Sequence, residues 1–339
     1  MKKTLGFLVA ATALVFALSG CGNQKADTQS TQASDSQYPM TIQNYTRGEG
    51  ALEWKEKDQV FDKAPERILA NTRPAAEFLL HLGLKDKIVG VGAVFGMDDP
   101  EVKADFEELN HLSDDYIGKE LALSVDPDLI FGRGGLFDNA EWGTGTVDSI
   151  NEMGIATYVQ ATSTQDATFQ SVYEDIDNIG QIFGVKPAAD KFKKELQTRE
   201  QHLKDRVKEQ GKEQTFALMF MTDPNELSVY PAYGESFFNS MFDVIGMDNV
   251  LRDMQGDVSV ETLIDADPDV LIVPDWTTTT PGTKKNDMVD AIMKNEKLSS
   301  MTAVKNKQVY SVDYNYMFGY GYQALTGMEL LMDEMYGEE

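Results

Sequence analysis

The sequence has little of what enzymes and metal-binding proteins use for their chemistry. Among its 339 residues there are three histidines and one cysteine, Cys21. It contains no Gly-x-Ser-x-Gly elbow and no phosphate-binding Walker loop. Bare zinc or manganese sites usually use several imidazoles, and the abundant acids lack the spacing of an EF-hand. We therefore expect no enzyme, no resident cofactor and no metal held directly by the chain.

Basic residues are also scarce. The chain has 30 Lys and Arg against 56 Asp and Glu, a formal net charge of −26. This imbalance argues against binding to nucleic acid and against a polybasic attachment to anionic lipid.

The N-terminus has the features of an export signal. Lys2 and Lys3 precede Leu5–Leu18, a mostly apolar run that is too short for a permanent membrane span. Leu18-Ser19-Gly20-Cys21 then resembles the lipobox of bacterial lipoproteins, in which the cysteine is acylated. We predict a signal peptide over 1–20 and a lipid (palmitate) anchor at Cys21 on the extracytoplasmic face of the cell membrane. The alternative is an ordinary cleaved signal with a chance cysteine.

The segment after Cys21 is too polar to form a core. Residues 22–37 are rich in Ser, Thr, Gln, Asn and Ala and contain no aromatic or branched aliphatic residue. We therefore predict that 21–40 is the lipidated cysteine followed by a flexible tether. The remainder, roughly 300 residues, is long enough for two domains.

Beyond residue 60, short branched-aliphatic runs alternate with longer helical patterns, which is typical of parallel α/β units. One predicted helix is long and mostly polar, with a thin apolar stripe at Phe192, Leu196, Leu203 and Val207 and a stop at Gly211. Such a helix fits a bridge between two lobes, although an ordinary surface helix remains the alternative. We place the N-terminal lobe at 41–185, the linker helix at 186–211 and the C-terminal lobe at 212–339.

The two flanking segments share landmarks. Glu120 stands six residues before Asp126-Pro127-Asp128, and Glu261 stands six residues before Asp267-Pro268-Asp269. Each half also has a helix that ends in a hydrophobic residue followed by glycine. Matched landmarks in the same order predict an α/β fold with two similar lobes and mainly parallel sheets.

Several segments, in order over about residues 60–336, carry a family resemblance: Pro65-Glu66-Arg67-Ile68, Leu82-Gly83-Leu84-Lys85-Asp86-Lys87-Ile88, Asp126-Pro127-Asp128-Leu129-Ile130, Val258-Ser259-Val260-Glu261-Thr262-Leu263 and Ala303-Val304-Lys305-Asn306-Lys307-Gln308-Val309-Tyr310. Together they resemble the substrate-binding proteins of iron-siderophore, haem and vitamin B12 ABC importers. This periplasmic-binding-protein-like class has a single rigid helix between its lobes. The resemblance implies a ligand cleft between the lobes and little hinge motion.

Candidate ligand residues follow the predicted strands, where α/β lobes bind ligands. Arg73 and Arg133 are two of only seven arginines, and their planar donors suit carboxylate, hydroxamate or catecholate oxygens. For each, a surface salt bridge is the alternative. Aromatic candidates, which give broad apolar contact, are Trp142 in the first lobe and Tyr233, Trp276, Tyr314, Tyr316 and Phe318 in the second. The last three lie in a Gly-aromatic stretch that fits neither a regular helix nor an alternating strand, and packing under the last helix is its alternative.

These residues and the resemblance predict a lipoprotein that captures a ferric siderophore for an ABC importer. Haem or a corrinoid is the alternative cargo, and an anchored enzyme or adhesin on the same scaffold is a more distant possibility. We expect a monomer whose partners are a permease dimer and its ATPase subunits. The resemblance also implies one docking glutamate per lobe: Glu120 in the first, and Glu235 or its rival Glu261 in the second.

Overall fold

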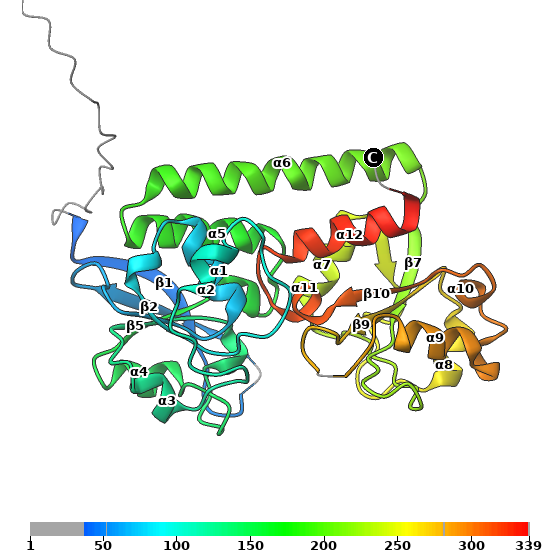
Figure 1. Ribbon diagram of the computed structural model, residues 1–339, viewed down its shortest axis with the longest axis horizontal. Coiled ribbons are helices and arrows are strands. Elements are labelled where there is room, and N and C mark those ends of the chain that lie inside the picture. The colour runs from blue at the N-terminus through cyan, green and yellow to red at the C-terminus, as the bar shows by residue number, and fades with distance from the viewer. Residues whose placement is uncertain (1–36, 52, 281, 338–339) are drawn as a thin grey trace, which may run out of the picture. The chain divides into compact units, whose positions relative to one another are not determined.

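Two four-stranded parallel sheets organise the computed structural model (Figure 1). The structure describes residues 37–51, 53–280 and 282–337. The N-terminal sheet has the strand order β4-β3-β5-β6, with β3 (Ile68–Ala70), β4 (Ile88–Val91), β5 (Leu129–Gly132) and β6 (Ala156–Val159). The C-terminal sheet has the order β10-β9-β7-β8, with β7 (Gln214–Leu218), β8 (Met247–Asn249), β9 (Val270–Asp275) and β10 (Val309–Asp313).

Both sheets have the same topology. Counted along each lobe, the strands lie in the order 2-1-3-4, and every pair of neighbours is parallel. The prediction of two similar α/β lobes is therefore confirmed. In each lobe the strand order reverses between the first and third strands, and open α/β sheets bind ligands at such a switch point.

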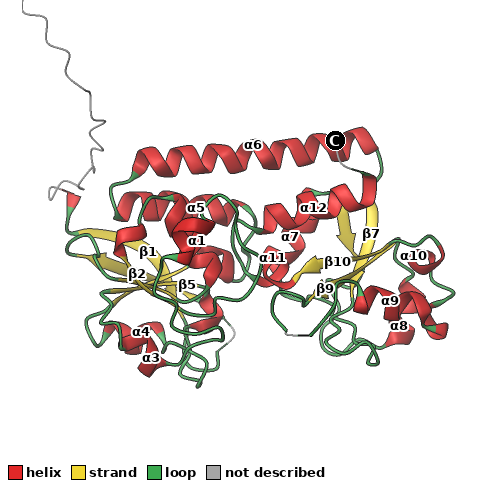
Figure 2. Ribbon diagram, in the orientation of Figure 1, coloured by secondary structure: helices red, strands yellow, loops and turns green. Residues whose placement is uncertain are grey.

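Helices cover the faces of both sheets (Figure 2). The N-terminal lobe has α1 (Arg73–His81), α2 (Lys103–Glu107), α3 (Lys119–Leu123), α4 (Val147–Asn151) and α5 (Gln170–Ile182). The C-terminal lobe has α7 (Ser236–Val244), α8 (Val260–Ala266), α9 (Asp287–Lys294), α10 (Thr302–Lys305), α11 (Tyr314–Phe318) and α12 (Ala324–Tyr336).

The matched sequence landmarks occupy equivalent places. Each Pro-Asp pair joins a short helix, α3 or α8, to the third strand of its sheet. The Asp128 carboxylate accepts the backbone N–H of Arg67 at 2.8 Å, and Asp269 accepts that of Thr215 at 3.0 Å. In both lobes the landmark aspartate therefore ties the third strand to the start of the first.

Helix α6 (Lys186–Gln210) runs alongside both lobes (Figure 1). Phe192, Leu196 and Leu203 form its buried stripe, and Gly211 ends it in a left-handed conformation with φ 61°. The sequence predicted this helix because a 3.6-residue apolar period and a C-terminal glycine are both local signals.

Three features differ from the sequence prediction. A polar antiparallel hairpin, β1 (Met40–Thr46) with β2 (Lys55–Phe61), precedes the first parallel strand, and β1 begins within the range assigned to the tether. The run Leu227–Tyr230 predicts a strand, but only Val229 and Tyr230 of this run pair, each in an isolated bridge. The short strand β8 was not expected. The signal peptide, Cys21 and the tether up to residue 36 lie outside the described residues.

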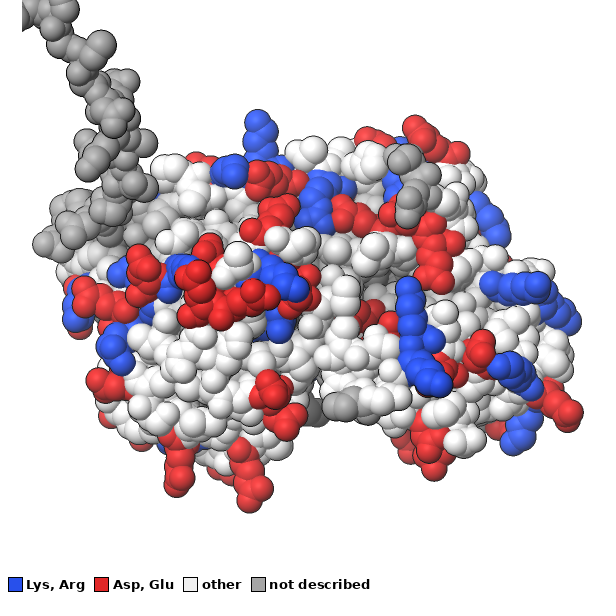
Figure 3. Space-filling view, viewed as in Figure 1, with Lys and Arg blue, Asp and Glu red and all other residues white. Residues whose placement is uncertain are grey.

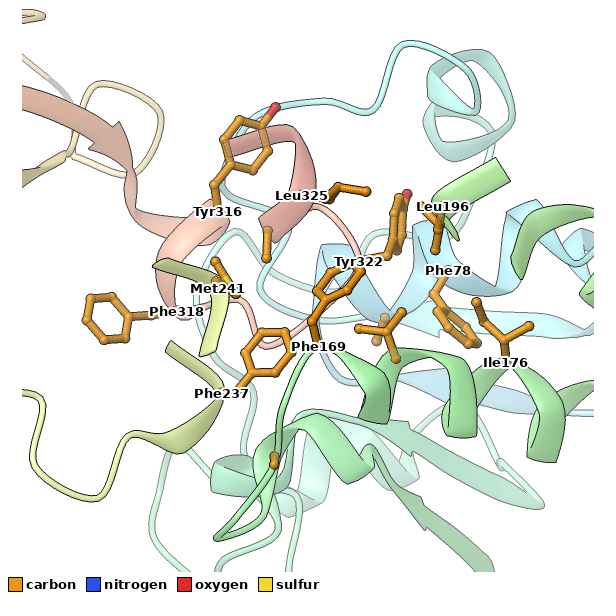
Figure 4. Close-up of a cluster of buried hydrophobic side chains, with 14 of the residues drawn as sticks. Phe78, Phe169, Ile176, Leu196, Phe237, Met241, Tyr316, Phe318, Tyr322 and Leu325 are labelled. Carbon is orange, nitrogen blue, oxygen red and sulfur yellow. The ribbon is translucent and has the colours of Figure 1, made fainter. Parts of the chain in front are cut away.

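The lobes meet at a buried polar junction beside α6. Glu77 of α1 is fully buried, and its Oε2 accepts a hydrogen bond from Gln323 Nε2 of the C-terminal lobe at 2.8 Å. Nearby, Tyr322 donates to Asp99 at 2.5 Å, and its ring contacts Phe192 of α6. Figure 4 shows that the apolar core continues on both sides of this junction.

Glu77 makes the stability of the protein depend on pH. Burial raises its pKa from an ordinary value near 4.5 to about 7, against the lowering effects of the Asp99 N–H, Arg73 and Gln323. The folded state thus binds a proton that the unfolded state has released, so stability falls as pH rises from about 4.5 through 7. We expect Glu77→Gln to remove this slope, worth about 3 kcal/mol at most. Urea denaturation of both proteins between pH 4.5 and 8 measures it, and parallel curves would contradict the assignment.

Candidate ligand-binding site

Arg133 directly follows β5, at the switch point of the N-terminal sheet. The amide of Asn71, directly after β3, holds its backbone: Oδ1 accepts from Arg133 N at 2.9 Å and Nδ2 donates to the Arg133 carbonyl at 3.0 Å. Gly132 is required here, because its φ is +144° and a Cβ would lie 1.9 Å from the Asn71 oxygen. The two central strands therefore fix the point from which the arginine side chain extends.

Phenol groups surround the Arg133 guanidinium. Nη1 donates to the Tyr116 hydroxyl at 3.1 Å, the Tyr320 ring centre lies 4.8 Å from Cζ, and Tyr314 is the third phenol that acts on this charge. Burial acts to lower the pKa of Arg133, but these three phenols outweigh it and raise the pKa. Among the described residues no carboxylate lies within 4.0 Å of the guanidinium. The site therefore presents a charged donor without a fixed anion.

The C-terminal lobe contributes an aromatic wall opposite Arg133. Trp276, directly after β9, stacks on Tyr314 with ring centres 4.9 Å apart and an interplanar angle of 23°. Its indole N–H donates to the Met221 carbonyl at 2.6 Å, which fixes the ring. Phe220, after β7, packs edge-on against both rings at 5.5 and 6.4 Å. The wall thus stands at the switch point of the second sheet.

The Gly-aromatic stretch begins with a short helix, contrary to the irregular conformation expected from its sequence. Asp313 caps α11 by accepting the N–H of Asn315 at 2.9 Å. Tyr316 and Phe318 are 7% and 5% exposed. Phe318 stacks on Phe238 of α7 at 5.2 Å and lies in the core (Figure 4). The structure therefore brings Tyr314, but not Phe318, to Arg133.

The lobes touch at this site. Asn315 Nδ2 donates to the Phe95 carbonyl of the N-terminal lobe at 2.8 Å, and the Gly96 N–H donates to Thr278 at 3.3 Å. A Cβ at Gly96 would lie 1.9 Å from Asn315 Nδ2, so this approach needs glycine. The cavity beside Arg133 is about 10 Å³, near the minimum for a single water. A ligand larger than a water molecule does not fit within this cavity, although Arg133, Trp276 and Tyr314 are each half-buried and thus partly accessible to solvent.

Among the described residues, the structure records no contact of Arg133 with the remaining ligand candidates Arg73, Trp142 and Tyr233. Arg73 donates to Asp98 at 2.7 Å and to the Val94 carbonyl at 2.7 Å, and its guanidinium covers the ring of Phe106. Its donors are therefore occupied within its own lobe. Trp142 and Tyr233 are 47% and 51% exposed.

The three candidate docking acids differ in their surroundings. Glu120 and Glu261 are exposed, each in the first turn of its short helix, α3 or α8. Glu235, which precedes α7, accepts hydrogen bonds from Tyr230 at 2.9 Å and from Tyr320 at 2.5 Å. Both of its carboxylate oxygens are thus already engaged.

Several residues at or near the site were not predicted from the sequence. Asn71 carries no local signal beyond following a strand, and Tyr116 lies in the loop between α2 and α3 with no local signal at all. Arg47 was missed because the hairpin that carries it was not predicted. Its guanidinium lies over Trp54 at 4.7 Å and donates to the Gly135 carbonyl at 3.2 Å, next to the loop that begins with Arg133.

A larger cavity, of about 610 Å³, lies along α6 and is lined by side chains of both signs, among them Glu101, Lys191 and Arg199. Its lining does not include Arg133 or the phenols around it, Tyr116, Tyr314 and Tyr320. Within the described ranges, no group of three or more His, Cys, Asp and Glu side chains is arranged to hold a metal ion. No helix in that part of the chain is long and apolar enough to cross a membrane.

Comparison with known proteins identifies relatives of this chain. The model of a family described as periplasmic binding protein matches residues 70–316. The uncharacterized ABC transporter substrate-binding lipoprotein YvrC of Bacillus subtilis strain 168 is 25% identical over 340 residues, which cover 99% of this chain and 98% of that protein.

Solved structures share the fold. A periplasmic binding protein from Veillonella parvula DSM 2008 matches with a TM-score of 0.76 at 21% identity, over 88% of this chain and 99% of that chain. An ABC-type Fe3+-hydroxamate transport system protein from Saccharomonospora viridis DSM 43017 matches with 0.69 at 22% identity, over the same shares. The vitamin B12 binding protein BtuF of Vibrio cholerae matches with 0.57 at 18%, over 79% and 95%.

Proposed function

Because this chain belongs to the periplasmic binding protein family, whose members bind substrates and are not enzymes, we propose that it is the substrate-binding lipoprotein of an ABC importer and that its cargo is a ferric siderophore. The observation that carries the cargo proposal is Arg133, a half-buried charged donor that faces phenols and, among the described residues, no carboxylate. Oxygen-rich iron chelates present the acceptors that such a guanidinium binds.

The aromatic wall supports the same cargo. Trp276 and Tyr314 offer a rigid apolar surface for the organic shell of a chelate, while Arg133 faces its oxygens. Haem is the second candidate, because the stacked rings also suit a flat macrocycle whose carboxylates pair with arginine. Absorption spectra and native mass spectrometry of protein purified from its own host distinguish the two cargoes.

Replacement of Arg133 tests the ligand site. We expect Arg133→Gln to weaken binding of a ferric chelate by about 1.5–3 kcal/mol, the range for a hydrogen bond to a charged group. Quenching of tryptophan fluorescence, with Trp276 beside the site, measures the affinity for ferric trihydroxamate, ferric tricatecholate and haemin. Arg252→Gln is the matched control, because Arg252 pairs with Asp243 and Asp248 on the surface of the C-terminal lobe. Equal affinities for wild type and Arg133→Gln would overturn the site.

The lipid anchor is proposed from Cys21 and from the lipoprotein relative. Cys21→Ser removes the thiol that accepts the lipid, so the protein should move from the membrane fraction to the medium or remain an unprocessed precursor. Cell fractionation with metabolic labelling by a radioactive fatty acid measures both. A variant that is processed and retained normally would exclude the anchor.

Docking to the permease is proposed for Glu120 and Glu261. Both are exposed at equivalent positions, on the side of the two lobes away from α6, where Figure 3 shows acidic side chains along the lower edge. Acids at such a rim steer and register a complex without altering the ligand site.

We expect Glu120→Ala with Glu261→Ala to leave ligand affinity unchanged and to reduce both uptake and stimulation of the importer's ATPase. The control is Glu152→Ala with Glu296→Ala, which removes one exposed acid from each lobe at sites unrelated by the repeat. Full uptake by the first double variant, at normal surface levels, would exclude this pair.

A further inference from the structure

The charge of Arg133 is connected to a carboxylate through one aromatic ring. The guanidinium lies over the face of Tyr320, and the Tyr320 hydroxyl donates to Glu235 Oε2 at 2.5 Å. The other carboxylate oxygen, Oε1, accepts from Tyr230 at 2.9 Å. A continuous series of contacts therefore runs from the N-terminal lobe, through Tyr320, to the residue that precedes α7.

The ring between the two charges is held in place by its own backbone. Tyr320 has a positive φ of 49°, which is unfavourable for a bulky side chain. Its carbonyl accepts a hydrogen bond from the Thr162 hydroxyl of the opposite lobe at 2.5 Å, and its ring packs on Phe237 at 6.1 Å. Positions that hold such a strained backbone are determined by their surroundings, and strain of this kind is often associated with function.

A carboxylate that accepts a hydrogen bond from a phenol increases the electron density of the phenol ring, because hydrogen-bonded groups polarise one another. A more negative ring face attracts a guanidinium more strongly. We propose that Glu235 is a positioning residue for the ligand-binding arginine and acts on Arg133 through the Tyr320 ring. This inference rests on the proposed function for its consequence in cargo binding, but the positioning itself concerns the ligand-free protein.

The same contacts separate this role from docking. A docking acid needs free oxygens at the surface, as Glu120 and Glu261 have, whereas both oxygens of Glu235 are taken by phenols. The role also differs from that of Tyr116. This phenol contacts Arg133 directly, by accepting a hydrogen bond from it at 3.1 Å, and does not connect it to Glu235. Loss of the Glu235 carboxylate should thus weaken ligand binding, and it should do so only in a protein that retains the Tyr320 hydroxyl.

The first test needs no ligand. In the NMR spectrum of arginine side-chain N–H groups, the signal of Arg133, assigned by its loss in Arg133→Gln, should be displaced by the ring current of Tyr320. We expect Tyr320→Phe and Glu235→Gln each to shift this signal, because the ring is no longer held or polarised by the carboxylate. Tyr310→Phe is the matched control. It also removes a phenol hydroxyl, but that hydroxyl donates to Gln308, directly before β10, and not to Glu235. An unchanged Arg133 signal in both variants would overturn the inference.

The second test is a double-mutant cycle on affinity for ferric trihydroxamate and ferric tricatecholate. Tyr320→Phe and Glu235→Gln should each weaken binding about two- to fivefold, the range for a cation–π contact. Glu235→Gln should have no further effect in the Tyr320→Phe background, and neither change should matter in the Arg133→Gln background. A general loosening of the lobe would persist in that last background, so persistence would contradict positioning.

The outcomes separate the two proposals. A shifted Arg133 signal in a protein that binds neither ferric chelate would leave the positioning role intact and overturn the ferric-siderophore cargo. Tight binding by the wild type, with additive effects of Tyr320→Phe and Glu235→Gln, would keep the cargo and overturn the positioning role. If Glu235→Gln keeps its ligand affinity but loses uptake, Glu235 acts in docking to the permease, and the positioning role is overturned.

Discussion

The site depends on a positive charge that is half-buried between two lobes, with no carboxylate beside it among the residues that the structure describes. Desolvating a charge is costly unless hydrogen bonds or an opposite charge compensate. At Arg133 the compensation comes from phenols, two of which belong to the lobe across the cleft. The contact between the lobes is therefore stabilised by the same guanidinium that a cargo would bind. An incoming ligand competes with the Tyr116 hydroxyl for a donor of Arg133, whereas the Tyr320 ring contacts the face of the guanidinium and not its N–H groups.

This competition constrains how the lobes can move. Helix α6 is packed along both lobes, and its Arg199 and Arg206 form ion pairs with Glu329 and Asp333 of α12. A hinge made of a continuous helix resists large rotations, because bending it would break backbone hydrogen bonds. Any opening needed to admit a cargo is thus more easily met by small shifts of the lobes. Packed interfaces tend to change between discrete arrangements, which suits exchange of phenols for ligand oxygens.

Much of the fold could be predicted because its signals are local. The stripe of Phe192, Leu196 and Leu203 with Gly211 predicted α6, and the paired Pro-Asp landmarks predicted the repeated topology. The β1–β2 hairpin could not be predicted, since its strands are largely polar and owe their place to pairing with each other and to contact with the edge strand β6. The short helix α11 could not be predicted for a related reason. Its aromatic residues do not follow a helical period, and their positions depend on packing against other elements, such as that of Phe318 on Phe238 of α7.

The site was harder to predict than the fold, because chemically identical residues in similar local contexts differ only in their tertiary partners. Arg73 and Arg133 both follow strands of one sheet, yet Asp98 neutralises the first and no carboxylate reaches the second. The acids behave in the same way. Glu235 follows a glycine and precedes a helix, as a docking residue would, but two phenols occupy it. Comparison of the two lobes adds information that the sequence alone does not carry: Glu120 and Glu261 are both exposed in the first turn of equivalent helices, whereas Glu235 accepts hydrogen bonds from two phenols.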